Sequence, residues 1–205
     1  MIDTPFRRVL AHTSPLVVRG YGYLGLHPNH LTCGALLLSI IAAIACGTGN
    51  TAVALGSWWL GRLLDGTDGL YARGSNQQSD FGAYLDILGD MAGYSLMIFG
   101  FMHLHPALAW TWLSILFCYV LCICSALALG ALCDKRSLAD HDNRGLRLSA
   151  GLAEGGETGI AYTLFLLLPQ YIEVLTMVWL VILGITIVAR TLLARKILND
   201  LPAGP

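Results

Sequence analysis

Apolar residues run through most of the chain in long stretches that charged residues seldom interrupt. The hydrocarbon core of a bilayer is about 30 Å thick, and a helix crosses it with roughly 20 apolar residues. The stretches that approach this length predict six membrane-spanning helices, at residues 31–48, 52–72, 82–103, 107–132, 155–170 and 173–194. The pattern therefore predicts an all-α, polytopic membrane protein.

The composition supports this class of protein. Hydrophobic residues make up 56% of the 205 positions and charged residues only 12%, with a mean hydropathy of +0.65, whereas soluble domains carry about 25% charged residues. The net charge of −1 argues against nucleic acid as a partner. No internal repeat or long linker divides the chain, so we expect a single membrane domain over residues 1–205, with the six-helix bundle at 29–197.

The segment before the first span, residues 1–28, mixes charged and apolar positions. Arg7, Arg8, His12 and Pro15 interrupt the apolar run that a cleavable signal peptide would need. We expect a short amphipathic segment that lies on the membrane surface. A solvent-exposed tail is the alternative.

The basic residues predict the orientation in the membrane. All twelve Lys and Arg residues fall on one side of the predicted topology, and the opposite connections, near residues 47–51, 103–106 and 169–173, carry none. The positive-inside rule then places both termini in the cytoplasm. In a bacterium the membrane would be the plasma or inner membrane.

The six cysteines lie in or beside the apolar spans, where cysteine commonly packs as a small apolar residue. Cys118, Cys122 and Cys124 are close in sequence, but no His or further Cys stands at the spacing of a structural zinc site. We assign the cysteines no chemistry.

Four carboxylates interrupt two of the apolar spans: Asp65 and Asp68 near the end of the second, Asp86 and Asp90 near the start of the third. An acidic residue at the centre of a membrane helix costs about 2.5–3.5 kcal/mol on insertion scales, so such residues usually face a polar cavity and mark function. Helical geometry places each pair on one helix face. A short loop joins the two spans, which should make them antiparallel neighbours and bring the four carboxylates together.

Converging carboxylates in a poorly solvated site need positive charge. Oxygen ligands favour Mg²⁺, Mn²⁺ or Ca²⁺ over zinc, and substrate phosphates usually complete the coordination of Mg²⁺. Gly66 and Gly69 leave room for a ligand, and Arg73, with the small Ala72 beside it, offers a permanently charged fork for phosphate. Gly82, one turn before Asp86, would keep the cavity open or else let two helices pack closely.

The spacing of these residues resembles a known signature: Asp65-Gly-Thr-Asp68-Gly69-Leu-Tyr-Ala72-Arg73, eight residues, Gly82, three residues, Asp86, three residues, Asp90. It is similar, without departure, to the signature of the CDP-alcohol phosphotransferase family, whose enzymes transfer substituted phosphate groups. The resemblance implies a six-helix membrane fold, usually a homodimer, with its active site open to the cytoplasm.

The same resemblance implies roles for the signature residues. Asp65, Asp68 and Asp86 would hold two divalent ions, Mg²⁺ or Mn²⁺, and Asp90 would complete the metal site and act as general base. The CDP pocket would be lined by Gly69, Ala72, Arg73 and Gly82. The base would deprotonate a hydroxyl of the acceptor, which attacks the phosphorus distal to cytidine so that CMP leaves.

A second likeness lies at the start of the first span, in His27-Pro28-Asn29-His30-Leu31-Thr32. It is similar to the Pro-Asn with a following Thr or Ser that precedes this family's signature, which implies that Asn29 and Thr32 contact the nucleotide. Pro28 and Asn29 fit a turn and helix cap equally well.

The alcohol acceptor is less constrained by sequence. Lys135, Arg136, Arg144 and Arg147, in the loop after the fourth span, could attract an anionic acceptor, although ordinary cytoplasmic loop charges explain them too. Glu154 and Glu157, at the entry of the fifth span, could bind acceptor hydroxyls or cap that helix.

The favoured function is transfer of a phosphatidyl group from CDP-diacylglycerol to a small alcohol in phospholipid biosynthesis. The same signature also serves enzymes that use CDP-choline or CDP-ethanolamine with diacylglycerol, and others that join inositol phosphates. A divalent-cation transporter is the alternative from another class, but all four aspartates cluster towards one side rather than through the membrane depth. A catalytically silent scaffold would be expected to lack a signature residue, and none is missing.

Overall fold

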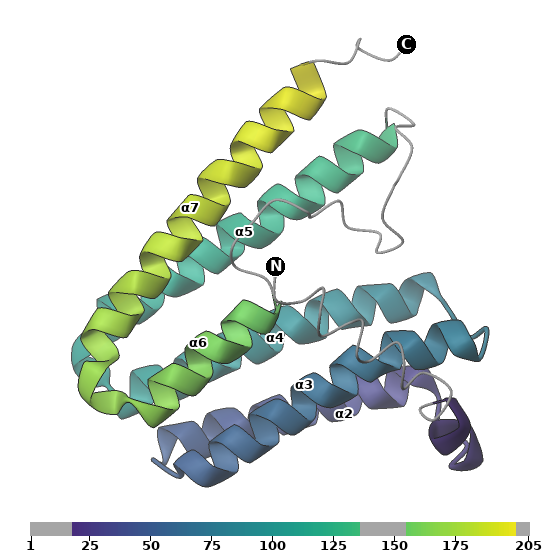
Figure 1. The fold of residues 1–205 in the computed structure, drawn as a ribbon, viewed down its shortest axis with the longest axis horizontal. Helices are drawn as coiled ribbons and strands as arrows, with labels where there is room; N and C mark the ends of the chain where they lie inside the picture. Colours follow the sequence, from purple (N-terminus) through teal and green to yellow (C-terminus); the bar gives the residue numbers. More distant parts are fainter. Residues whose placement is uncertain (1–17, 136–154, 200–205) are drawn as a thin grey trace.

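The computed structural model describes residues 18–135 and 155–199, and this part of the chain is helical almost throughout. The chain order of its elements is α2 (Pro28–Gly47), α3 (Thr51–Gly74), α4 (Asp80–Leu104), η1 (Pro106–Leu108), α5 (Ala109–Lys135), α6 (Gly155–Leu167), η2 (Pro169–Tyr171) and α7 (Ile172–Asn199). Each predicted span coincides with one of the α-helices, α2 to α7 (Figure 1). The prediction of an all-α membrane protein is therefore confirmed.

The helix ends differ from the predicted bounds for local reasons. α2 begins at Pro28 rather than at residue 31, because proline fits the first helical position and the His27 side chain accepts a hydrogen bond from the backbone N–H of Asn29. α7 continues to Asn199, beyond residue 194, because a helix can extend past its apolar stretch into basic residues such as Lys196, which suit its carboxyl end.

Four helices are long and apolar enough to cross a membrane among the described residues: α2, α4, α5 together with η1, and α7 together with η2. α3 has the length, but it carries Arg62, Asp65 and Asp68. α6 has 13 residues, fewer than the roughly 20 that span a bilayer. The crossing of the membrane by α3 and α6 stays a prediction.

α2 is the central contact of the first three long helices. It packs along both α3 and α4, whereas α3 and α4 approach each other far less closely in the described chain. Two glycines allow this packing, since a Cβ added to Gly61 would lie 3.2 Å from the carbonyl oxygen of Ala35, and one added to Gly100 would lie 2.5 Å from that of Ala43. Small residues of this kind let membrane helices approach closely.

The remaining helices pack differently. α5 and α7 run side by side and diverge from the α2, α3 and α4 group, while α6 bridges the two parts (Figure 1). Large aromatic side chains fill the junction, and the least exposed are Trp58, Phe101, Trp112, Tyr162 and Phe165.

Hydrogen bonds join three of the buried aromatic side chains in this core, Tyr119, Tyr162 and Trp179. Tyr162 donates to the carbonyl oxygen of Tyr94 at 2.9 Å, its hydroxyl lies 3.0 Å from that of Tyr119, and Trp179 donates to the Tyr119 hydroxyl at 3.0 Å. These bonds join α4, α5, α6 and α7. Because hydrocarbon offers no substitute partner, they favour one arrangement of the four helices.

The start of α2, the end of α3 and the start of α4 lie at the same end of the molecule (Figure 1). Residues 18–23 form a short helical segment there. It is held to α3 by the Tyr21 hydroxyl, 3.1 Å from that of Thr67, while Tyr71 donates to the carbonyl oxygen of Leu26 at 2.8 Å. Residues 1–17 of the predicted surface segment lie outside the described residues.

Candidate active site

Three carboxylates from two helices meet at this end of the molecule. Asp65 and Asp68 stand on α3 and Asp86 on α4, and each offers an oxygen that lies within 4.8 Å of the other two. Asp68 is buried and the other two are half-buried. The predicted convergence of the acidic pairs therefore holds for these three, although the two helices meet through their contacts with α2 rather than as a tightly packed pair.

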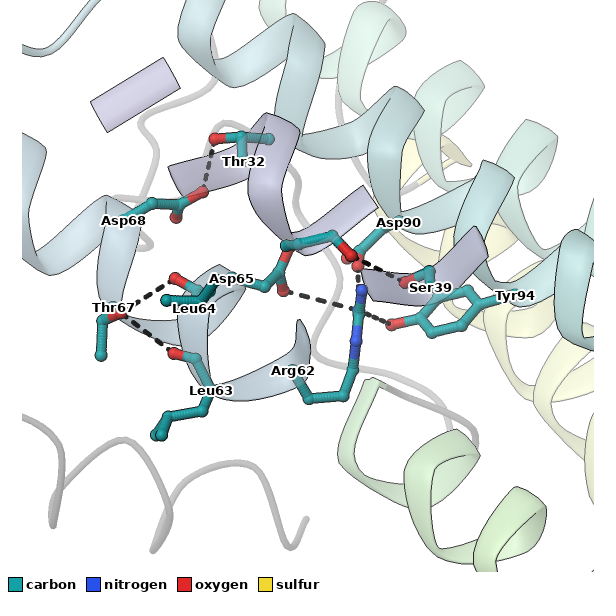
Figure 2. Close-up of polar contacts among 11 residues, drawn as sticks. Thr32, Ser39, Arg62, Leu63, Leu64, Asp65, Thr67, Asp68, Asp90 and Tyr94 are labelled. Carbon is teal, nitrogen blue, oxygen red and sulfur yellow. Dashed lines mark hydrogen bonds and ion pairs between the residues drawn. The ribbon is translucent and has the colours of Figure 1, made fainter. Parts of the chain in front are cut away.

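The fourth carboxylate, that of Asp90, is linked to these three by the side chain of Arg62. Asp90 forms an ion pair with the guanidinium of Arg62, and the same Nη1 atom lies 3.5 Å from Oδ2 of Asp65 (Figure 2). Arg62 thus supplies part of the positive charge that the acidic cluster needs. Four carboxylates and one guanidinium still leave a formal charge of −3, so the site continues to favour cations.

α2 contributes a hydrogen bond to the cluster. Thr32 donates from its hydroxyl to Oδ2 of Asp68 at 2.5 Å, and both residues are buried (Figure 2). Thr32 belongs to the Pro-Asn segment whose role the sequence left open. The structure places it against a signature aspartate.

Asn29 lies one turn earlier on α2, next to the start of α4. A Cβ added to Gly82 would stand 3.3 Å from Oδ1 of Asn29 and 3.1 Å from the hydroxyl of Ser79. His27 rather than Asn29 is the N-cap of α2, so the cap interpretation of Asn29 is wrong while Pro28 does occupy the first turn. The Asn29 side chain is left to face the Gly82 backbone.

Arg73 lies near the end of α3 and folds back along its own helix. A Cβ added to Gly69 would stand 3.2 Å from Nη1 of Arg73, so the missing side chain makes room for the guanidinium. Arg73 is exposed and Ala72 beside it is half-buried. The guanidinium is therefore accessible to a phosphate at the same end of α3 as the carboxylates.

Most of the predicted acceptor residues belong to the segment 136–154. Arg136, Arg144, Arg147 and Glu154 lie outside the described residues, whereas Lys135 is exposed at the end of α5 and Glu157 lies in the first turn of α6. The role of these residues stays a prediction.

Sequence reasoning missed the contacts of Arg62 with the acidic cluster, because it used this residue only as a topological charge. The signal was available in part, because Arg62 stands three residues before Asp65 and shares its helix face. Its contact with Asp90 on another helix was not available from that pattern.

The fold and the acidic site define a class of protein. It is a helical membrane protein in which carboxylates, an exposed arginine and glycines lie together at one end of the bundle. The family described as CDP-alcohol phosphatidyltransferase matches residues 25–187. The chain belongs to this family and is an enzyme of the CDP-alcohol phosphotransferase type, as its signature indicated.

Relatives agree with this assignment. The inner membrane protein YnjF of Escherichia coli (strain K12) is 34% identical over 152 residues, which cover 72% of each chain. The phosphatidylinositol phosphate synthase PgsA1 of Mycobacterium tuberculosis, solved with CDP-DAG bound, is similar in fold with a TM-score of 0.73 at 22% identity, over 90% of this chain and 94% of that one. Its complex with manganese and citrate gives a TM-score of 0.68 at 22% identity, over 89% and 88% of the two chains.

Proposed function

We propose that this enzyme transfers a phosphatidyl group from CDP-diacylglycerol to a small hydroxyl acceptor and releases CMP, as a step of phospholipid biosynthesis. The observation that carries the proposal is the convergence of Asp65, Asp68 and Asp86 within 4.8 Å at an end of the bundle that also presents Arg73. The binding of CDP-DAG by PgsA1 supports the choice of donor.

The residues present fit divalent cations. The three carboxylates offer oxygen ligands only, which suits Mg²⁺ or Mn²⁺, and PgsA1 has been solved with manganese. Asp65, Asp68 and Asp86 would hold up to two ions, with Asp90 as the fourth carboxylate of the site. Bound ions would neutralise the phosphates of the donor and the charge that develops on the leaving group.

Different side chains bind the donor and take the proton of the acceptor. Arg73 binds a phosphate of the donor, and Asn29 and Thr32, with the open space at Gly82, border the nucleotide. Asp90 takes the proton of the acceptor hydroxyl. The acceptor oxygen then bonds to the phosphorus distal to cytidine, the bond from that phosphorus to the bridging oxygen breaks, and CMP leaves with the electron pair.

The charge distribution supports a cytoplasmic site. The described connections at the opposite end, residues 48–50, 105–108 and 168–171, contain no Lys or Arg, whereas Arg73, Lys135 and Lys196 lie at the ends of α3, α5 and α7. We accordingly infer that both termini and the active site face the cytoplasm. A homodimer remains part of the proposal through the family resemblance.

The test is CMP release by the purified enzyme from CDP-diacylglycerol, with Mn²⁺ or Mg²⁺, against a panel that includes glycerol phosphate, inositol phosphate and serine. We expect release with one acceptor, its loss on chelation, and a fall of about 10²–10⁴-fold in Asp90→Asn, the range for removal of a general base. Asp80→Asn, which alters an exposed carboxylate at the start of the same helix, is the matched control and should retain activity.

Other outcomes redirect the assignment. CMP release only from CDP-choline or CDP-ethanolamine with diacylglycerol would overturn the phosphatidyl donor but keep the reaction class. If no donor gives CMP release, and Mn²⁺ enters liposomes that contain the protein, the divalent-cation transporter would be favoured.

A further inference from the structure

Arg62 is a charged residue buried in the interior of the helix bundle. It is 8% exposed, and its guanidinium carbon lies 5.0 Å from the ring centre of Trp58 and 5.3 Å from that of Tyr94. Its Nη1 also donates to the Tyr94 hydroxyl at 3.3 Å. Two aromatic faces and a hydroxyl therefore hold the guanidinium in one position.

The same nitrogen connects α3 with α4. Nη1 donates to Oδ1 of Asp90 and lies 3.5 Å from Asp65, which belongs to the acidic triad (Figure 2). Asp90 itself is not fixed by burial, because its side chain remains 28% exposed. In the described part of the chain, the hydrogen bond from Arg62 therefore constrains the Asp90 carboxylate relative to the triad.

The surrounding helices leave space for this contact. Gly93 stands three residues after Asp90 on α4, where an added Cβ would lie 3.0 Å from the Ser39 hydroxyl and 3.6 Å from Nη2 of Arg62. The absence of a side chain at Gly93 therefore lets α4 approach α2 beside the guanidinium. Burying the charge of Arg62 between helices costs free energy unless the charge is paired. Buried charges within membrane helices usually mark function, so we infer that the ion pair of Arg62 with Asp90 does more than pack the helices.

We propose that Arg62 is a positioning residue for the transfer reaction, a role that rests on the proposed function. It commits Oδ1 of Asp90 to the guanidinium and leaves Oδ2 available to the acceptor hydroxyl. The aromatic residues Trp58 and Tyr94 keep Arg62 from following Asp90 into other positions. Because its charge is permanent, Arg62 orients Asp90 before any substrate arrives.

The experiment compares Arg62→Gln, Arg62→Lys, Asp90→Asn and the double variant Arg62→Gln/Asp90→Asn in CMP release. Arg62→Gln is expected to lower kcat about 100-fold, the cost of a misplaced catalytic group, with the KM for the CDP donor within about threefold of wild type. Arg62→Lys keeps the charge without the planar fork of the guanidinium, so its kcat should be about tenfold higher than that of Arg62→Gln. In the Asp90→Asn background, Arg62→Gln should lower kcat no further, because the group that it positions is already inactive.

Two controls separate positioning from folding. Arg190→Gln removes another buried arginine, which is 5% exposed and donates to the carbonyl oxygen of Cys122 on the far pair of helices, and it should leave kcat near the wild-type value. Mn²⁺ should raise the thermal midpoint of Arg62→Gln at least as much as that of wild type, since the triad is intact and one competing cation is gone. If Arg62→Gln alone does not fold, Arg62→Lys takes its place, measured alone and in the Asp90→Asn background, where it should cause no further loss.

The outcomes are distinct. A wild-type kcat in Arg62→Gln, an additive loss in the double variant, or an equal loss in Arg190→Gln would each overturn the role of Arg62 while leaving the proposed function in place. Wild-type protein that releases no CMP from any donor would overturn the proposed function and this inference with it.

Discussion

Thr32 and Asp68 join two helices through one short hydrogen bond, in which the Thr32 hydroxyl donates to Oδ2 of Asp68 at 2.5 Å. Thr32 is 7% exposed and Asp68 is 6% exposed, so water competes little for either group. One oxygen of the carboxylate is thereby fixed by α2 without any cation. This explains why a threonine of the first span belongs to the same site as the aspartates of the second.

Replacement of Thr32 by valine should weaken the metal site. A hydrogen bond to a charged group contributes about 1.5–3 kcal/mol, so the Mn²⁺ concentration for half-maximal CMP release should rise roughly tenfold or more in Thr32→Val. Thr32→Ser keeps the hydroxyl and should stay close to wild type. Equal Mn²⁺ requirements in wild type and Thr32→Val would show that the hydrogen bond does not organise Asp68.

Metal binding should stabilise the folded protein independently of catalysis. A ligand that binds only the native state stabilises it by about 2.7 kcal/mol at 100 times its dissociation constant, which raises the thermal midpoint of unfolding. We expect Mn²⁺ to produce this rise in detergent-solubilised wild type and in Asp80→Asn, and EDTA to reverse it. The rise should be lost in Asp68→Asn; a rise that persists there would place the cation elsewhere.

The space at Gly82 should matter for the nucleotide donor. In Gly82→Ala the new methyl group would meet Oδ1 of Asn29 at 3.3 Å and the Ser79 hydroxyl at 3.1 Å. We expect the KM for the CDP donor to rise about tenfold, corresponding to about 1.4 kcal/mol, with a smaller change in kcat. Gly184→Ala adds a methyl group on α7, where nothing lies within 4 Å, and its kinetics should resemble those of wild type.

The packing of α2 against α4 should depend on Gly100. A methyl group at this position would lie 2.5 Å from the carbonyl oxygen of Ala43, so the two helices would have to separate. Overpacking of this kind costs about 1–3 kcal/mol, which should lower the thermal midpoint of Gly100→Ala measured by loss of the monodisperse species. Gly56→Ala, where nothing lies within 4 Å, should be neutral or slightly stabilising.

Local sequence patterns were sufficient for the helices and for most of the candidate site. Apolar length predicted every long helix of the described chain, because a bilayer demands continuous apolar stretches. Spacing of three and four residues placed Asp65 with Asp68, and Asp86 with Asp90, on shared helix faces, because helical periodicity is a local property. The fixed spacing of the signature then pointed to the enzyme family.

Contacts between helices were not predictable in the same way. Asn29 fitted both a cap and a binding residue until the structure showed His27 at the cap and Asn29 beside Gly82. Likewise, Arg73 could be expected to face a ligand, but its place over Gly69 follows from the fold of its side chain along α3.

The sequence by itself determined that this protein is a helical membrane protein with paired aspartates, since hydropathy and helical periodicity act along the chain, and the spacing of its signature pointed by resemblance to one enzyme family. Only the tertiary structure decided that α2 packs between α3 and α4, that three aspartates meet within 4.8 Å, and that Arg62 holds the fourth. The physical reason is that these relationships depend on close packing at glycines such as Gly61 and Gly100, and on an ion pair between residues 28 positions apart. Neither the packing at these glycines nor the ion pair produces a periodic pattern in the sequence.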